Sequence, residues 1–221
     1  MTEPGTNYGR NIFINCPFDE EYVPLLHAIT FTICFAQFIP RSALEVQDSG
    51  VERLAKIVRI IRDCAYGIHD ISRVEVGDDP QIPLPRFNMP FECGLFFGAL
   101  HFGTGRQKQK QLLIFDSVPF RPHKTMSDIA GKDPAFHHGD PATAIGCVRT
   151  FLAPKPGVTG LPGEEQIRSA YASFQDALPH LLNQFGINGK EISSPTYWND
   201  FVKIVDAYLS KRFGAGVPAA G

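Results

Sequence analysis

Short apolar runs alternate with helical patterns over the first 152 residues. The runs at 11–15 (NIFIN), 38–46 (FIPRSALEV), 66–71 (YGIHDI) and 110–117 (KQLLIFDS) are rich in β-branched and aromatic residues, which predicts four buried strands. Helical spacing predicts helices at 22–37, 51–62, 88–102 and 142–152. This alternation predicts an α/β domain with a parallel sheet of four to five strands and helices on both faces.

The stretch 51–62 illustrates the pattern. Leu54, Ile57, Val58 and Ile61 recur at helical spacing with basic residues between them. We therefore expect an amphipathic helix that buries these four side chains.

A Pro- and Gly-rich stretch at 154–163 (PKPGVTGLPG) divides the chain. We expect residues 1–153 to form an α/β domain and 154–163 to be a linker. Apolar residues at helical spacing between 167 and 209 predict a helical appendage over 164–213. The tail 214–221 (GAGVPAAG) is expected to be disordered.

Composition narrows the class of protein. The chain has 21 basic and 23 acidic residues and a net charge of −2, so nothing global indicates nucleic acid or an anionic membrane as a partner. Its five cysteines include no CxxC pair, which is typical of buried thiols in a reducing compartment and argues against a structural zinc. With no apolar leader or membrane-spanning run, we expect a cytoplasmic protein without metal.

The loops after the first three strands carry the chemistry-bearing side chains. In a parallel sheet these loops lie at one edge, where ligands bind. The residues expected to converge there are Phe18, Asp19, Asp48, Asp70, Ser72, Asn88 and Glu92.

Glu92 is the main catalytic candidate because it lies within an apolar helix. Asn88 is suited to be the helix N-cap and Pro90 is tolerated in the first turn, so Glu92 falls about one turn into the helix. The positive helix end there favours an ionised carboxylate, as a nucleophile or a stabiliser of a cation requires. The alternative is that Glu92 only complements the helix dipole or pairs with Arg86.

Other candidates also have simpler interpretations. Asp70, at a strand end, is more typical of a cap or loop anchor than of a catalytic group. Arg41 is suited to hold a phosphate, or to pair with Glu45 or Asp48. His69 points to the opposite face of the strand from Asp70, so the two do not form a dyad.

Further motifs give less support. His137 and His138 are interpreted as loop or capping residues, and no base is evident for Cys93 as a nucleophile. The chain has no P-loop and no GxGxxG motif for NTP hydrolysis or hydride transfer.

The segment 88–94 (NMPFECG), followed by LFFG, resembles a family motif, Asn-x-x-x-Glu-x-Gly. It is similar to that of bacterial Toll/interleukin-receptor (TIR)-like NAD-cleaving domains and nucleoside 2-deoxyribosyltransferases. Segments 12–18 and 57–72 extend the resemblance, which covers roughly residues 10–117. Cys93 departs from the Leu or Ile common after the Glu, and helices 163–213 have no counterpart.

The resemblance implies a flavodoxin-like fold and a hydrolase that cleaves the N-glycosidic bond of NAD. Glu92 would be the catalytic carboxylate, with Asp70 and Asn88 positioning the ribose and Pro17 and Phe18 lining the nucleotide pocket. The full candidate substrate-binding set is Pro17, Phe18, Asp19, Arg41, Asp48, Asp70, Ser72 and Asn88.

Cleavage of this bond passes through an oxocarbenium-like transition state, and NAD would be a substrate and not a cofactor. We expect a homo-oligomer acting in bacterial antiphage defence or as a toxin, with a nucleotide or nucleoside as its small-molecule partner. The alternatives are a deoxyribosyltransferase or nucleotide N-glycosidase, and a non-catalytic nucleotide-sensing or scaffold module.

Overall fold

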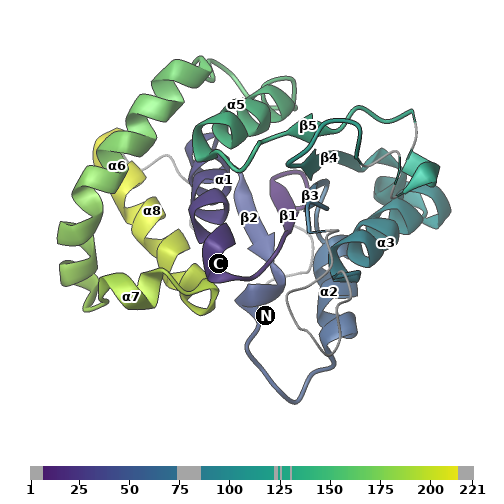
Figure 1. Ribbon diagram of the computed structural model, residues 1–221, viewed down its shortest axis with the longest axis horizontal. Coiled ribbons are helices and arrows are strands. Elements are labelled where there is room, and N and C mark those ends of the chain that lie inside the picture. The colour runs from purple at the N-terminus through teal and green to yellow at the C-terminus, as the bar shows by residue number, and fades with distance from the viewer. Residues whose placement is uncertain (1–6, 74–85, 122–123, 125, 130, 214–221) are drawn as a thin grey trace. The chain divides into compact units, whose positions relative to one another are not determined.

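The computed structural model describes residues 7–73, 86–121, 124, 126–129 and 131–213 (Figure 1). The strands are β1 (Asn11–Asn15), β2 (Ile39–Ser42), β3 (Tyr66–Asp70), β4 (Gln111–Asp116) and β5 (Ala135–Phe136). The α-helices are α1 (Val23–Phe35), α2 (Arg53–Arg62), α3 (Asn88–Phe102), α5 (Pro141–Leu152), α6 (Glu164–Phe185), α7 (Gly189–Ile192) and α8 (Trp198–Phe213).

The chain divides into two compact units. The first, called the sheet unit, comprises Met1–Pro17, Arg41–Ala43 and Asp48–Gly139. The second, called the helical unit, comprises Phe18–Pro40, Leu44–Gln47 and Asp140–Gly221. This division differs from the expected boundary at residue 153, because α1 and α5 pack with α6 and α8 in the helical unit.

The five strands form one parallel sheet in the order β2-β1-β3-β4-β5. The β3 register places Ile68 beside Ile14 of β1 and His69 beside Ile114 of β4. All residues of β1 and β3 are buried, as the apolar runs indicated. The expected flavodoxin-like α/β fold is thus confirmed, and its strand order reverses between β1 and β3, where such sheets bind ligands.

Helices α2 and α3 pack together in the sheet unit. Phe13 of β1 contacts a buried cluster made by Ile57, Ile60 and Ile61 of α2 and Phe96 of α3. Burial of these side chains fixes both helices against the sheet, since burying each one contributes about 1.5–3 kcal/mol.

The buried face of α2 differs from the expected one. Leu54 and Val58 are 39% and 48% exposed, whereas Ile57, Ile60 and Ile61 are almost fully buried. The prediction that Leu54 and Val58 lie in the core was wrong. Both sets have helical spacing, and the set containing all three isoleucines is the one that meets α3 and β1.

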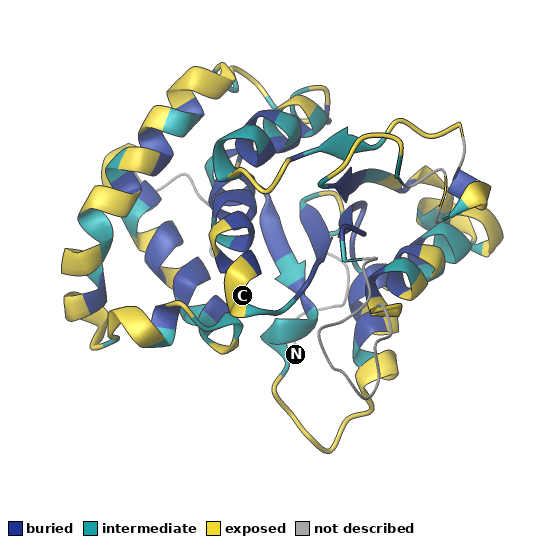
Figure 2. Cartoon of the chain, in the orientation of Figure 1, coloured by how far each residue is buried: buried dark blue, intermediate teal, exposed yellow. Residues whose placement is uncertain are grey.

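The core of the helical unit is aromatic. Ten of the thirteen residues of α1 are buried, and Figure 2 shows this helix as almost wholly dark blue. Phe31 of α1 lies 5.2 Å from both Tyr171 and Phe174 of α6, measured between ring centroids. Trp198 at the start of α8 donates its indole N–H to Thr30 Oγ1 at 3.0 Å.

Several element boundaries differ from expectation. The second strand ends at Ser42 because Ala43–Glu45 forms a 3-10 turn, and β5 is an additional short strand paired with β4. Helix α6 continues through Pro179 and ends before Gly186, whose φ of 68° suits glycine. The tail 214–221 lies outside the described residues.

None of the described helices has the length and apolarity needed to cross a bilayer.

A buried amide links the central strands to α3. Asn15, at the end of β1, donates from Nδ2 to the Met89 carbonyl at 2.8 Å and to His69 Nδ1 at 3.1 Å. A Cβ on Gly67 would lie 2.5 Å from His69 Nε2 and 2.9 Å from Phe96, so only glycine fits beside the histidine. Asn15 and His69 therefore fix where α3 begins.

His69 is held as a neutral ring. It is fully buried, and burial, aided by Lys110, lowers its pKa to about 3 from an ordinary value of 6.5. Below pH 6.5 the unfolded chain binds a proton that the folded chain does not. Stability is therefore complete above pH 6.5 and is lost as the pH falls toward 3.

We expect His69 to remove about 4 kcal/mol from the free energy of unfolding between pH 6.5 and 3. His69→Leu should flatten this acid limb, while the exposed His101→Gln should leave it unchanged. Urea unfolding at several pH values measures the slopes. His27, whose pKa burial also lowers to about 3, contributes equally in all three proteins. Equal slopes in wild type and His69→Leu would contradict the assignment.

Candidate functional site

Polar residues occupy the carboxyl ends of the three central strands. β1 ends at Asn15, β3 at Asp70 and β4 at Asp116, and all three side chains are buried. Parallel pairing brings the strand ends to one edge of the sheet. The loop that follows β3 leads to α3, which carries Glu92.

Glu92 is a buried carboxylate that forms an ion pair with Arg53. The residue is 5% exposed, and its Oε1 lies 3.7 Å from Nη2 of Arg53 on α2. Burial raises the pKa of Glu92, and Arg53 acts in the opposite direction. The Arg53 side chain is 62% exposed, so solvent weakens this compensation.

The expectation that the helix end favours ionised Glu92 needs correction. Glu92 is the fifth residue of α3, beyond the first turn in which the helix dipole acts most strongly. The loss of hydration on burial raises the pKa of Glu92 more than Arg53 lowers it. The protonated form is therefore more populated than in a free glutamate at the same pH. The positive group beside Glu92 is a side chain of α2.

The predicted N-cap was also wrong by one residue. Phe87 occupies the cap position without a side-chain hydrogen bond, and Asn88 is the exposed first residue of α3. The start of the helix is instead held by the Asn15 bond to the Met89 carbonyl. A tertiary contact thus performs the positioning that the local sequence assigned to Asn88.

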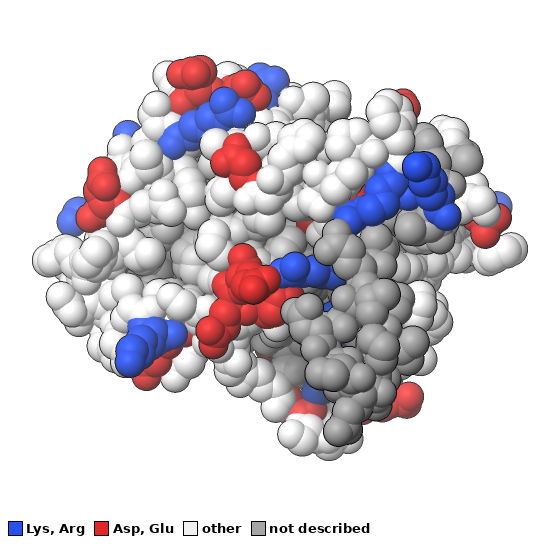
Figure 3. Space-filling view, viewed as in Figure 1, with Lys and Arg blue, Asp and Glu red and all other residues white. Residues whose placement is uncertain are grey.

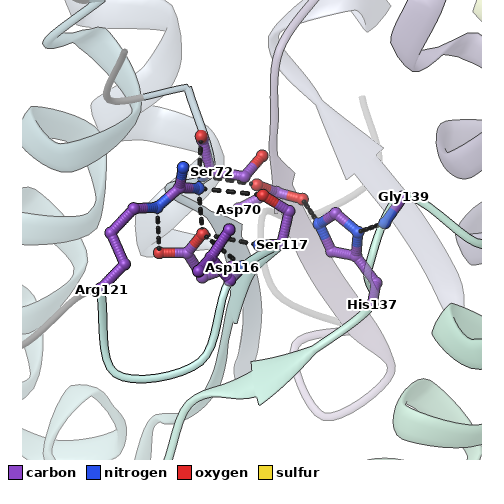
Figure 4. Close-up of polar contacts among 8 residues, drawn as sticks. Asp70, Ser72, Asp116, Ser117, Arg121, His137 and Gly139 are labelled. Atoms are coloured by element: carbon purple, nitrogen blue, oxygen red, sulfur yellow. Dashed lines mark hydrogen bonds and ion pairs between the residues drawn. The ribbon is translucent and has the colours of Figure 1, made fainter.

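Asp70 contacts a histidine from after β5. Figure 4 shows His137 beside it, with Nε2 2.8 Å from Asp70 Oδ2. The Gly139 backbone N–H donates to His137 Nδ1 at 2.9 Å, which leaves the ring proton on Nε2, facing Asp70.

Asp70 also holds its own loop. Its Oδ1 accepts the Ser72 backbone N–H at 2.8 Å, and the residue is fully buried. These are the contacts of a loop anchor, one of the two interpretations of Asp70. Its direct contact with a substrate stays a prediction.

A second buried carboxylate, Asp116, lies at the end of β4. Asp116 pairs with Arg121, which donates from Nε at 3.2 Å and also from Nη2 (Figure 4). The same Nη2 donates to the Ser72 carbonyl at 2.7 Å and to Ser117 Oγ at 2.9 Å. Arg121 therefore ties the loop after β3 to the loop after β4.

The remaining predicted residues are dispersed. Pro17 is buried two residues after the end of β1, and Arg41 is half-buried in β2. Asp48 is exposed, and its Oδ1 accepts the Gly50 N–H at 2.8 Å. Phe18 and Asp19 belong to the helical unit, where Asp19 caps the turn Glu20–Tyr22.

Among the predicted residues, the structure thus brings Asp70 and Ser72 into direct contact. For Pro17, Phe18, Asp19, Arg41, Asp48 and Asn88, a binding role stays a prediction.

Sequence reasoning missed four residues of this region. Asp116 ends an apolar strand as Asp70 does, and that signal was sufficient to find it. Arg53, Arg121 and His137 had no such signal, because each acts through a partner that only the fold brings near. His137, interpreted as a loop or capping residue, lies 67 positions after Asp70.

We expect Asp116 and Arg121 to be energetically coupled in stabilising the sheet unit. Arg121→Met leaves a buried carboxylate without its cation and should cost about 3 kcal/mol of unfolding free energy. Adding Asp116→Asn should recover much of that loss, because the buried charge is removed. Urea denaturation of the two single variants and the double variant gives the coupling energy. Strictly additive effects would show that the pair is not energetically coupled.

Charges on the face drawn in Figure 3 lie in small groups of both signs. Among the described residues, no three His, Cys, Asp or Glu side chains are grouped as a metal site requires. No protein-family model matches the chain, and no curated protein or solved structure matches it either.

Proposed function

We propose that this protein hydrolyses the N-glycosidic bond between nicotinamide and ribose in NAD, with Glu92 as the catalytic carboxylate. The observation that carries the proposal is the burial of Glu92 beside a solvent-exposed arginine, 3.7 Å away. A buried carboxylate whose compensating cation lies mostly in solvent is costly to fold and is typical of functional sites.

The position of Glu92 in the fold supports the same assignment. In sheets of this topology, ligands bind beyond the carboxyl ends of the strands, near the reversal of strand order. That reversal lies between β1 and β3, and α3 follows β3 in the chain. Asn15 joins β1, β3 and the first turn of α3 at this point.

Hydrolysis of the nicotinamide–ribose bond requires only one catalytic carboxylate. The C1′–N1 bond breaks, its electron pair passes to the nicotinamide nitrogen, and neutral nicotinamide leaves without protonation. Water adds to C1′ and loses a proton, which gives ADP-ribose. Glu92 would stabilise the positive charge at C1′, or attack C1′ and form a glycosyl-enzyme that water then hydrolyses.

Asp70 would act indirectly in this scheme. Its oxygens are directed to the Ser72 N–H and toward His137, and the residue is fully buried. We assign it to positioning of the loop after β3.

Glu92→Gln should abolish nicotinamide release, with a loss of about a thousandfold or more, because the amide cannot neutralise the cationic transition state. Chromatography after incubation with NAD, NADP and deoxynucleosides measures the products over a range of protein concentrations. Glu165→Gln, an exposed glutamate on α6, is the matched control and should retain activity.

Other outcomes of this assay select the alternatives. Release of bases from deoxynucleosides would replace the proposal with a deoxyribosyltransferase or N-glycosidase. Thermal stabilisation by a nucleotide without any product would replace it with a sensing module.

We expect the acid limb of kcat/KM to lie above the ordinary glutamate pKa of 4.5, because burial raises the pKa of Glu92 and the ionised form is the active one. Arg53→Gln should move the limb to still higher pH, since Arg53 lowers this pKa. Arg59→Gln, an exposed residue of the same helix, is the control. A limb that stays in place or moves to lower pH in Arg53→Gln would contradict the role of Glu92.

A further inference from the structure

Helix α3 is largely apolar all round, and within the described part of the chain it packs along one side, against α2 and the sheet. Its buried residues are Met89, Glu92, Cys93 and Phe96. On the other side, Phe91 is 56% exposed and Phe102 is 90% exposed. A helix that is apolar all round is normally buried all round. The exposed side of α3 is therefore suited by its sequence to pack against another protein surface.

Two glycines lie on this exposed side of α3. Gly94 and Gly98 are inside the helix, where each glycine costs roughly 1 kcal/mol relative to alanine. A Cβ at either position would meet no described atom within 4 Å, so packing within the described chain does not require them. Glycines at this spacing allow another helix backbone to approach closely.

We propose that this surface of α3 binds the same surface of a second copy of the chain. We call it the outer face of α3. It comprises Phe87, Phe91, Gly94, Gly98 and Phe102. The two helices would lie antiparallel and cross at the glycines.

The order of residues along the outer face favours a second copy over another partner. Glycines lie at its centre and large aromatic residues at both ends, so an antiparallel copy places Phe91 next to Phe102 of the other copy. The two glycine pairs then face each other. This is the self-complementary arrangement that a two-fold interface requires. The five residues of the outer face are all uncharged. Two copies of this face therefore do not repel each other, and the face does not favour an oppositely charged partner.

The available area is of the right order. Phe87, Phe91 and Phe102 are 66%, 56% and 90% exposed. Their rings in two copies would bury roughly 800 Å², before the helix backbones are counted. Specific interfaces need about 1,000 Å² or more, which the glycine contact and neighbouring side chains would supply.

Sedimentation velocity over a range of concentrations tests the proposal without any assay of activity. Wild type should form a dimer, and Phe102→Ser should weaken it by about a hundredfold, because the two-fold axis removes two rings. Phe120→Ser is the control, since Phe120 is 72% exposed but lies outside α3. A wild type that is monomeric throughout, or equal effects of both substitutions, would overturn the proposal.

Alanine at the glycines gives a second test. Gly94→Ala and Gly98→Ala should raise the thermal stability of the monomer at low concentration, because the helix gains and nothing clashes. The same methyl groups should hold the two helices apart and weaken the dimer by at least about tenfold. A more stable protein with unchanged dimerisation would overturn the close helix contact.

Discussion

The Asn15 side-chain amide is the interaction on which the geometry of the site depends. Its two N–H donors serve the Met89 carbonyl in α3 and the unprotonated Nδ1 of His69 in β3. The second bond exists only while His69 is neutral, and complete burial ensures that. Strand, strand and helix are thus joined by neutral groups, and Glu92 lies three residues beyond the anchored carbonyl.

Three buried carboxylates in the sheet unit show how differently a charge can be compensated. Asp116 has Arg121 and two backbone N–H donors, and Asp70 has the Ser72 N–H and the neighbouring His137 ring. Glu92 has an arginine at 3.7 Å that is mostly in solvent. The first two therefore hold loops in place. Among these three described carboxylates, Glu92 has the most solvent-exposed cation as its partner, which is why we propose it as the catalytic group.

Local pattern predicted β1, β2, β3, β4 and α3, because burial in a parallel sheet leaves a plain apolar signature. It failed where two sets of residues share a helical pattern. The predicted set contains Leu54 and Val58 and the buried set contains Ile60, and contacts with α3 and β1 decide between them. It also missed contacts between distant segments, since nothing near Asp70 indicates His137. The start of α3 was misassigned because a tertiary bond replaced the local cap.

The apolar character of α3 meets two different demands. On the side facing the sheet, the apolar residues of α3 exclude water from Glu92 and so raise the pKa of its carboxyl group. The same residues therefore make it costly to bury the ionised carboxylate. On the side facing solvent, the apolar residues do not contribute to the burial of Glu92. A polar outer face would leave Glu92 equally buried. Phe91 and Phe102 at the surface, with two glycines between them, are not explained by the burial of Glu92, and the proposed contact with a second copy accounts for them.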